Sequence, residues 1–208
     1  MSVTTAIFDF GNVLVRWDPP AALEELYPGR GEAEQALAAA GFAQWNAEVL
    51  DAGGDIEDSL AAIRLREPDR YPVLNAYLAN IDKAHRDLVD GTSDIVEELS
   101  AGGTRLLGMT NAGFPGYDAM RRRAPVTGLM DDIFVSARER LLKPERQAFL
   151  RLLERNGLAP AACVFIDDTE ANVAGARAAG LHAIRFIDAG QLRDDLAGLG
   201  LLASRAAQ

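Results

Sequence analysis

Three short apolar stretches of the sequence each end in polar residues whose side chains suit metal binding or catalysis. These residues are Asp9, Thr110 with Asn111, and Asp167 with Asp168. Carboxylates that lie close together repel one another and raise each other's pKa values unless a cation lies between them. Oxygen ligands of this kind suit a hard cation, and Mg²⁺ is the common choice. The pattern therefore predicts a shared acidic site with Mg²⁺ as its cofactor.

A lysine and a threonine add the other groups that phosphoryl transfer needs. Lys143 precedes an amphipathic helical pattern, and Pro144 suits the first turn of that helix. We expect the Lys143 side chain to reach the acidic site and neutralise charge there, while the Thr110 hydroxyl helps to hold an anion. A cation, a lysine, a threonine and a free carboxylate fit phosphoryl transfer, in which an aspartate can act as a covalent nucleophile.

The elements that must position these residues alternate along the chain. Nearly continuous apolar stretches are typical of strands buried on both faces of a sheet. We expect such strands at residues 5–10, 105–109, 132–135, 163–166 and 183–187. Helical patterns occur at residues 93–100, 145–156 and 171–179, with a last helix and a frayed end after Gln191. The alternation predicts an α/β fold with a parallel sheet and helices on both faces, whose strand ends bring the polar residues together.

One stretch interrupts this alternation, because no strand pattern occurs between Asp18 and about Asp90. It contains helical segments at residues 21–27, 32–40, 42–50, 56–67 and 71–81. The stretch is too long for an ordinary connection between a strand and a helix. We therefore predict a core formed by residues 1–17 and 91–208 and a helical cap formed by residues 18–90.

The composition limits the classes of partner. The 208 residues include 31 Asp and Glu against 21 Lys and Arg, a formal net charge of −10. An acidic surface repels the phosphates of nucleic acids and anionic membranes, so we expect neither as a partner. One cysteine, Cys163, excludes an internal disulfide. No targeting segment or membrane span is apparent, and we expect a cytoplasmic protein. The oligomeric state is not predicted.

The order of the motifs resembles that of the haloacid dehalogenase-like superfamily. The matching segments are Asp9-Phe10-Gly11-Asn12, Thr110-Asn111, Lys143-Pro144 and Asp167-Asp168. The helical insertion is similar to the α-helical cap of this family. The resemblance implies a Rossmann-like core with the first strand in its centre.

The resemblance also implies a role for each motif. Asp9 is the expected nucleophile, and Thr110, Asn111 and Lys143 are the expected ligands of the phosphoryl group. The expected Mg²⁺ ligands are the carboxylates of Asp9, Asp167 and Asp168 and the backbone carbonyl of Gly11. The expected activity is a Mg²⁺-dependent phosphatase that acts on a small phosphorylated molecule through an aspartyl-phosphate.

Gly11 departs from the pattern of most phosphatases in this family. They carry a second aspartate at this place, which protonates the leaving group and then activates water. Such a group contributes about 10² to 10⁴ in rate. Three interpretations stay open: substrates with better leaving groups, another residue, for example from the cap, that supplies the proton, or a slow or retired enzyme. The DxGN motif resembles a branch that includes sugar-1-phosphate phosphatases, among them α-glucose-1-phosphate phosphatases, which favours the first.

Other activities of the superfamily are alternatives. A 2-haloacid dehalogenase also lacks the second aspartate, but it has no use for Asp167 and Asp168 as paired metal ligands. A phosphonoacetaldehyde hydrolase needs a cap lysine, and Lys83 is poorly placed for that role. A phosphomutase normally needs the missing acid. A catalytically weak protein that binds a phosphorylated ligand is a further alternative.

Cap residues are expected to select the substrate, and Trp45, Glu48 and Asp51 lie on or near a helix that stops at the glycine pair 53–54. Trp45 and Glu48 share one face of a helix at a spacing of three residues, and an aromatic ring with a carboxylate suits a sugar. Trp17 follows the first strand and either closes over the site or packs against the cap. Asn172 is expected to orient an aspartate or the Thr110 loop and not to bind metal.

Overall fold

The computed structural model describes residues 2–203, whose core is a five-stranded parallel sheet with the strand order β3-β2-β1-β4-β5. The strands are β1 (Thr5–Phe8), β2 (Arg105–Thr110), β3 (Asp132–Val135), β4 (Cys163–Asp167) and β5 (His182–Arg185). The predicted α/β fold is confirmed. Because β1 lies in the centre and pairs with β2 and β4, the polar residues that follow these three strands lie at one edge of the sheet.

Helices cover both faces of the sheet. One face carries α6 (Thr92–Ala101), α7 (Phe114–Arg123) and α11 (Ala189–Gly198), and the other carries α9 (Arg146–Arg155) and α10 (Glu170–Ala178). Successive side chains of a strand point to opposite faces. Accordingly, Ala6 and Phe8 pack in the first layer and Ile7 in the second.

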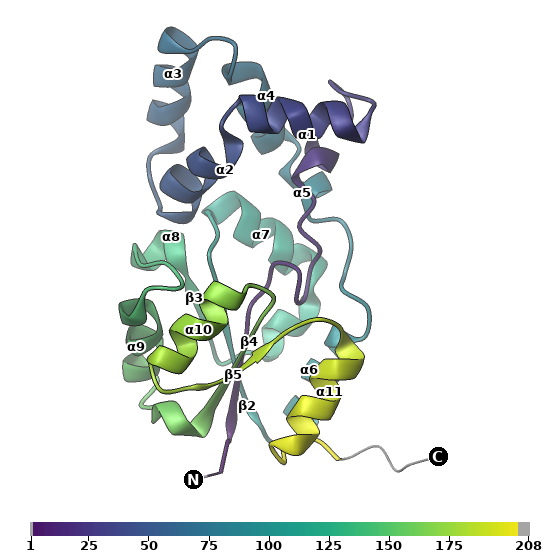
Figure 1. Ribbon diagram of the computed structural model, residues 1–208, viewed down its shortest axis with the longest axis vertical. Helices are drawn as coiled ribbons and strands as arrows, with labels where there is room; N and C mark the ends of the chain where they lie inside the picture. Colours follow the sequence, from purple (N-terminus) through teal and green to yellow (C-terminus); the bar gives the residue numbers. More distant parts are fainter. Residues whose placement is uncertain (1, 204–208) are drawn as a thin grey trace.

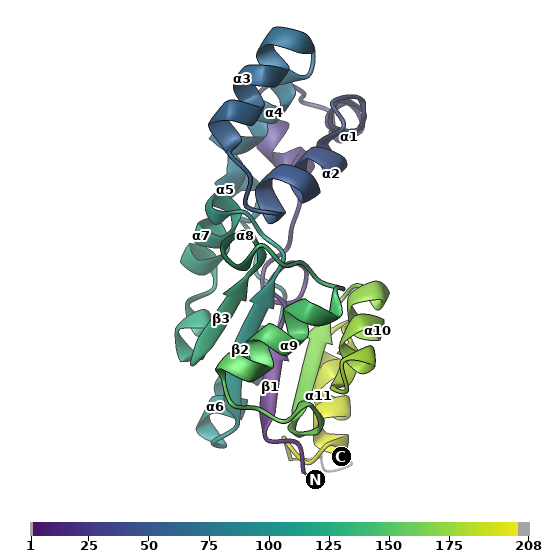
Figure 2. The same ribbon diagram turned by 90° about the vertical axis from the view of Figure 1, so that its left-hand side faces the viewer.

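The segment between β1 and α6 forms a separate helical cluster over the carboxyl ends of the strands (Figures 1 and 2). Its elements are η1 (Pro19–Leu23), α1 (Arg30–Ala39), α2 (Phe42–Trp45), η2 (Asn46–Asp51), α3 (Ile56–Arg66), α4 (Tyr71–Ala79) and α5 (Ile81–Ala84). Phe42, Leu74 and Tyr77 are buried in its own apolar core. We retain residues 18–90 as the proposed boundaries of this cap.

Two antiparallel segments join the cap to the core. The backbone N–H of Arg16 donates to the carbonyl of Asp87 at 2.8 Å, and the N–H of Asp18 donates to the carbonyl of Ala84, also at 2.8 Å. The outgoing and returning chains are therefore tied together where the cap begins.

Some elements differ from the sequence-based expectation. The expected helix at residues 42–50 is instead α2 followed by a π-helix, η2, and the expected helix at 21–27 is only the short 3₁₀ turn η1. The extent of α7 and four short elements were not predicted; the four are α5, η3 (Pro125–Leu129), α8 (Ser136–Glu139) and η4 (Pro160–Ala162). The expected frayed end falls largely on residues 204–208, outside the described residues.

No helix within residues 2–203 combines the length and the apolar character that crossing a membrane requires.

Candidate active site

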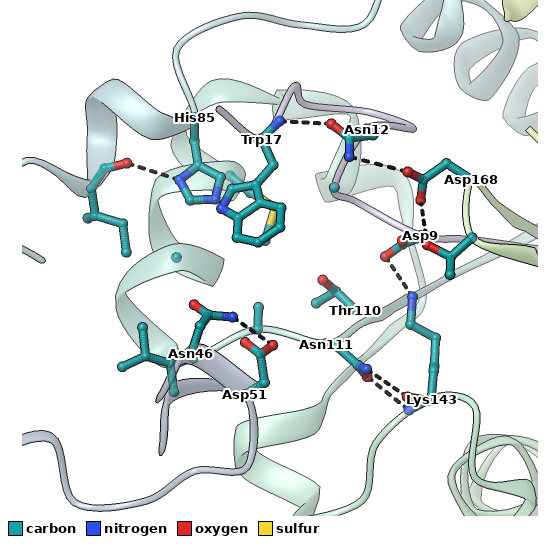
Figure 3. Close-up of a pocket in the computed structure, with 18 of the residues that line it drawn as sticks. Asp9, Asn12, Trp17, Asn46, Asp51, His85, Thr110, Asn111, Lys143 and Asp168 are labelled. Carbon is teal, nitrogen blue, oxygen red and sulfur yellow. Dashed lines mark hydrogen bonds and ion pairs between the residues drawn. The ribbon is translucent and has the colours of Figure 1, made fainter. Parts of the chain in front are cut away.

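A cavity of about 250 Å³ lies between the cap and the carboxyl ends of the central strands. Figure 3 shows the side chains that line it. The core contributes Asp9, Thr110, Lys143 and Asp168, and the cap contributes Asp51 and Tyr77. The cavity therefore brings together most of the residues that the motifs single out, and it adds cap residues opposite them.

Asp9 lies directly after β1 and is buried. Its Oδ1 accepts hydrogen bonds from the backbone N–H of Phe10 at 2.7 Å and pairs with Nζ of Lys143 at 2.8 Å. Burial raises the pKa of Asp9 to about 8, and Asp167 adds to this, while Lys143 opposes it. A cation bound beside Asp9 would favour the carboxylate form that a nucleophile needs.

Lys143 is a buried cation shared by two carboxylates. Its Nζ lies 2.8 Å from Oδ1 of Asp9 and 2.7 Å from Oδ2 of Asp167, and it donates to the carbonyl of Met109 at 3.0 Å. Burial alone would lower the pKa of Lys143, but Asp9 and Asp167 outweigh this effect and raise it. Because an ammonium group has three N–H donors, each is already used. A phosphoryl oxygen would therefore have to replace one of these acceptors.

Asn111 holds the loop that carries Lys143. Its side-chain amide donates to the Lys143 carbonyl and accepts from the Lys143 backbone N–H, both at 2.9 Å. On the other side, Gly175 of α10 lets this loop approach closely, since a Cβ there would lie 2.5 Å from the carbonyl oxygen of Pro144. The structure thus shows the Asn111 side chain positioning the Lys143 loop, in place of the predicted phosphate contact.

The acidic residues form a cluster that fits a metal ion. Asp9, Asp167 and Asp168 each offer an oxygen, and these atoms lie within 4.8 Å of one another. Gly11, whose backbone carbonyl is the other predicted ligand, lines the same cavity. Oxygen donors of this number and charge suit Mg²⁺, so the residues present fit the cation that the sequence predicts.

Asp167 and Asp168 differ in what they already bind. Asp167 is fully buried, and its two oxygens accept from Lys143, from the Thr169 backbone and from Nδ2 of Asn172, at 2.7 to 3.1 Å. Asp168 is partly exposed and accepts from Nδ2 of Asn12 at 3.2 Å. Asp168 therefore has fewer contacts to lose than Asp167 if a metal ion binds, and Asp167 holds Lys143 in place. Of the two partners expected for Asn172, the structure shows the aspartate, because Nδ2 of Asn172 donates to Asp167.

Thr110 ends β2 and is buried. Figure 3 shows its hydroxyl directed into the cavity beside Asp9. A hydroxyl in this place can donate a hydrogen bond to an anion held beside Asp9.

The structure does not place Trp45 and Glu48 at the cavity. Trp45 is only 4% exposed, packs inside the cap and donates from its indole nitrogen to Oγ of Ser59 at 2.9 Å. Glu48 is exposed and accepts from Gln44 at 2.9 Å. Their predicted role in substrate selection therefore has no geometric basis. Trp17 does line the cavity, and its indole nitrogen donates to the Tyr77 hydroxyl at 3.3 Å.

Four polar residues of the cap and linker line the cavity, and of these only Asp51 was singled out from the sequence. They are Asn46, Asp51, Tyr77 and His85. Asn46 and Asp51 lie at the two ends of the π-helix η2, and Nδ2 of Asn46 donates to Oδ2 of Asp51 at 2.9 Å. Only the glycine pair that follows at residues 53–54 marks the place in the sequence where this helix ends.

A comparison with models of protein families identifies the family of the chain. A family model described as haloacid dehalogenase-like hydrolase matches residues 3–180. The chain belongs to this family of hydrolases. The four motifs of this hydrolase thus lie in the cavity or support it, in the order that the sequence predicts.

Curated relatives match this hydrolase over part of its length. The protein CbbY of Rhodobacter capsulatus is 30% identical over 111 residues, which cover 52% of this chain and 49% of that protein. The sesquiterpene phosphatase astK of Aspergillus oryzae is 29% identical over 96 residues, which cover 46% of this chain and 49% of that protein. The matches therefore span about half the length of these relatives.

Solved structures share the fold of the hydrolase. The putative HAD-hydrolase YfnB from Bacillus subtilis, bound to magnesium, superposes with a TM-score of 0.71 at 20% identity, over 95% of this chain and 100% of that one. The L-2-haloacid dehalogenase from Xanthobacter autotrophicus superposes with a TM-score of 0.62 at 19% identity, over 94% and 83%. At these identities the likeness concerns the fold alone.

Proposed function

We propose that this hydrolase is a Mg²⁺-dependent phosphatase that cleaves a small phosphate monoester through an aspartyl-phosphate on Asp9. The observation that carries the proposal is the arrangement of Asp9 and the buried cation Lys143 beside the partly exposed Asp168. A nucleophilic carboxylate, a fixed positive charge and a metal ligand are the groups that phosphoryl transfer uses. The phosphatase among the curated relatives supports this activity.

Each residue of the site has a separate role in this mechanism. Phe10 and Lys143 both hold Oδ1 of Asp9, which leaves Oδ2 to face the substrate. This oxygen attacks phosphorus, and the Thr110 hydroxyl donates to a phosphoryl oxygen. Water then hydrolyses the aspartyl-phosphate. Mg²⁺, held by Asp9, Asp168 and the Gly11 carbonyl, would supply positive charge to the phosphoryl oxygens.

The cavity favours a small, uncharged leaving group. Among its described lining residues, Lys143 is the one cationic side chain, and two carboxylates already share it. Leu50, Ile81 and Met120 provide an apolar wall. A second anionic group on the substrate would therefore meet no free cation in the part of the cavity that the structure describes. We propose a neutral alcohol as the leaving group, with sugar-1-phosphates retained as candidates from the motif.

The charges of the cavity disfavour a 2-haloacid dehalogenase. Its substrate would carry a carboxylate that needs a cationic partner, and Lys143 is engaged by Asp9 and Asp167. Asp168 would add further repulsion in a site without metal.

Hydrolysis of p-nitrophenyl phosphate tests the proposal. We expect phosphate release with Mg²⁺, loss of that release with EDTA, and recovery when Mg²⁺ is added back in excess, because the acidic cluster needs a cation to bind a phosphoryl group. A panel of sugar phosphates then ranks the substrates. Activity that is unaffected by EDTA would contradict the metal requirement. Chloride release from 2-chloropropionate without any phosphatase activity would favour the dehalogenase instead.

A further inference from the structure

The cavity has open space where related phosphatases carry a proton donor. A Cβ added at Gly11 would meet no atom within 4 Å, so no neighbouring side chain of the described residues fills the space that an aspartate would occupy there. A phosphatase for poor leaving groups nevertheless needs an acid close to the ester oxygen.

Three carboxyl groups line the cavity among the described residues: those of Asp9, Asp51 and Asp168. Asp9 and Asp168 belong to the nucleophile and the metal site. Asp51 is the third carboxyl group, which has neither of these roles, and it belongs to the cap. Figure 3 shows the carboxylates of Asp51 and Asp9 facing the same cavity, one from the cap side and one from the core side.

The position of Asp51 is fixed by contacts to both parts of the molecule. Its carboxylate accepts from Asn46 within the cap at 2.9 Å and interacts with the backbone N–H of Gly113 in the core. Its backbone carbonyl accepts from Oγ of Ser136 at 2.6 Å. Gly53 adopts φ +73°, and a Cβ there would lie 2.1 Å from the carbonyl oxygen of Ala137, so this part of the cap rests directly on the core.

The geometry of phosphoryl transfer places the leaving group on the cap side. The attacking and leaving oxygens lie roughly in line through phosphorus, so a nucleophile that enters from the core directs the ester oxygen toward the cap. We propose that Asp51 is the general acid and base of the phosphatase, supplied by the cap in place of the side chain that Gly11 lacks. The inference rests on the proposed phosphatase activity and names the residue that moves its protons.

The proton follows a balanced path in this scheme. In the first step an Asp9 oxygen bonds to phosphorus, the bond from phosphorus to the ester oxygen breaks, and the Asp51 proton moves to that oxygen, so a neutral alcohol leaves. In the second step the Asp51 carboxylate takes a proton from a water molecule as the water oxygen bonds to phosphorus. The bond between phosphorus and Asp9 breaks, phosphate leaves, and both aspartates return to their first state.

The acidity of Asp51 suits this task. Burial raises its pKa to about 7, against the opposing effects of the Gly113 N–H and of Lys143. The group is therefore able both to give and to take a proton near neutral pH. The other titratable groups that line the cavity are Asp9, Tyr77, His85, Lys143 and Asp168.

Two other groups on the cap side, those of His85 and Tyr77, are less suitable than Asp51 as proton donors to the leaving group. His85 Nδ1 lies 2.9 Å from the Ile81 carbonyl, which requires that this nitrogen carry the proton, and burial lowers the pKa of His85, so Nε2 is an acceptor. Burial raises the pKa of Tyr77 to about 12, which makes it a weak proton donor.

The substitution Asp51→Asn tests the proposal with two esters of nearly the same shape. Phenyl phosphate has a poor leaving group and p-nitrophenyl phosphate a good one. We expect kcat/KM for phenyl phosphate to fall by about 10² or more, because this parameter covers the steps up to loss of the alcohol. The kcat/KM for p-nitrophenyl phosphate is expected to change by less than about tenfold, since its leaving group needs little protonation.

The pH profile gives a second reading of the same variant. In the unaltered protein, kcat/KM for phenyl phosphate should fall as the pH rises above about 7, because the acid form of Asp51 is lost there. This fall should be absent from Asp51→Asn. The matched control is Asp55→Asn, an exposed cap aspartate that caps α3, which should leave the ratio of the two esters unchanged.

A rescue variant separates chemistry from structure. Because Gly11 has room for a Cβ and does not adopt a positive φ, Gly11→Asp added to Asp51→Asn should recover at least about tenfold in kcat/KM for phenyl phosphate. Equal losses for both esters, with no rescue, would mean that Asp51 only fastens the cap and would overturn the inference. Inactivity of the unaltered protein toward p-nitrophenyl phosphate would instead contradict the proposed function itself.

Discussion

Replacing Asp9 with asparagine is expected to abolish turnover of p-nitrophenyl phosphate and to leave the protein folded. The amide oxygen can still accept from the Phe10 N–H and from Lys143, and Lys143 keeps its ion pair with Asp167. The amide is not a nucleophile, however, so the aspartyl-phosphate cannot form. Loss of a covalent nucleophile costs about 10⁴ or more in kcat.

The measurement compares phosphate release by Asp9→Asn with that of Asp69→Asn, an exposed cap aspartate outside the cavity. Thermal unfolding followed by circular dichroism shows that both variants are folded. We expect the control to keep its activity. Full activity in Asp9→Asn would remove Asp9 from the mechanism.

Replacing Lys143 with methionine is expected to cost both stability and activity. The change leaves Asp9 and Asp167 buried side by side without the cation that now lies 2.8 and 2.7 Å from them. Removing one partner of a buried ion pair costs about 3–5 kcal/mol in the free energy of unfolding. Turnover should fall as well, because the Asp9 carboxylate loses a donor that orients it.

The chain offers a matched control, since Lys83 is its other lysine. Lys83 pairs with Glu25 at 2.7 Å on the surface of the cap, and exposed pairs of this kind contribute little. Urea unfolding of Lys143→Met and Lys83→Met should therefore give clearly different midpoints. Equal midpoints would show that Lys143 does not support the buried carboxylates.

The sheet was predictable because each strand is marked by residues that are adjacent in the sequence. Strands buried on both faces are apolar along their length, and the polar residue that follows each one marks the edge where a ligand binds. Asp9, Thr110 and Asp167 each come at such an end, and the parallel order of the strands brings them together. Strand β1 ends at Phe8, whereas the sequence predicted a strand to residue 10. Asp9 and Phe10 instead begin the loop that forms the site.

The cap side of the cavity was less predictable, because it depends on packing between two parts of the chain. A regular helical spacing puts Trp45 and Glu48 on one face, but the π-helix η2 changes the spacing and directs Asn46 and Asp51 to the cavity instead. No local pattern distinguishes such a turn from an ordinary helix. In the same way, the sequence shows Asn111 but not its partner, the backbone of Lys143, which is distant along the chain.

The most direct test of the central claim is detection of the covalent intermediate. The protein is mixed with p-nitrophenyl phosphate and Mg²⁺, quenched with acid within one turnover and digested for mass spectrometry. The account predicts a peptide that contains Asp9 and carries the added mass of one phosphoryl group, and it predicts no such peptide from Asp9→Asn. A phosphoryl group on another residue, or rapid release of phosphate without any labelled peptide across the quench times, would contradict it.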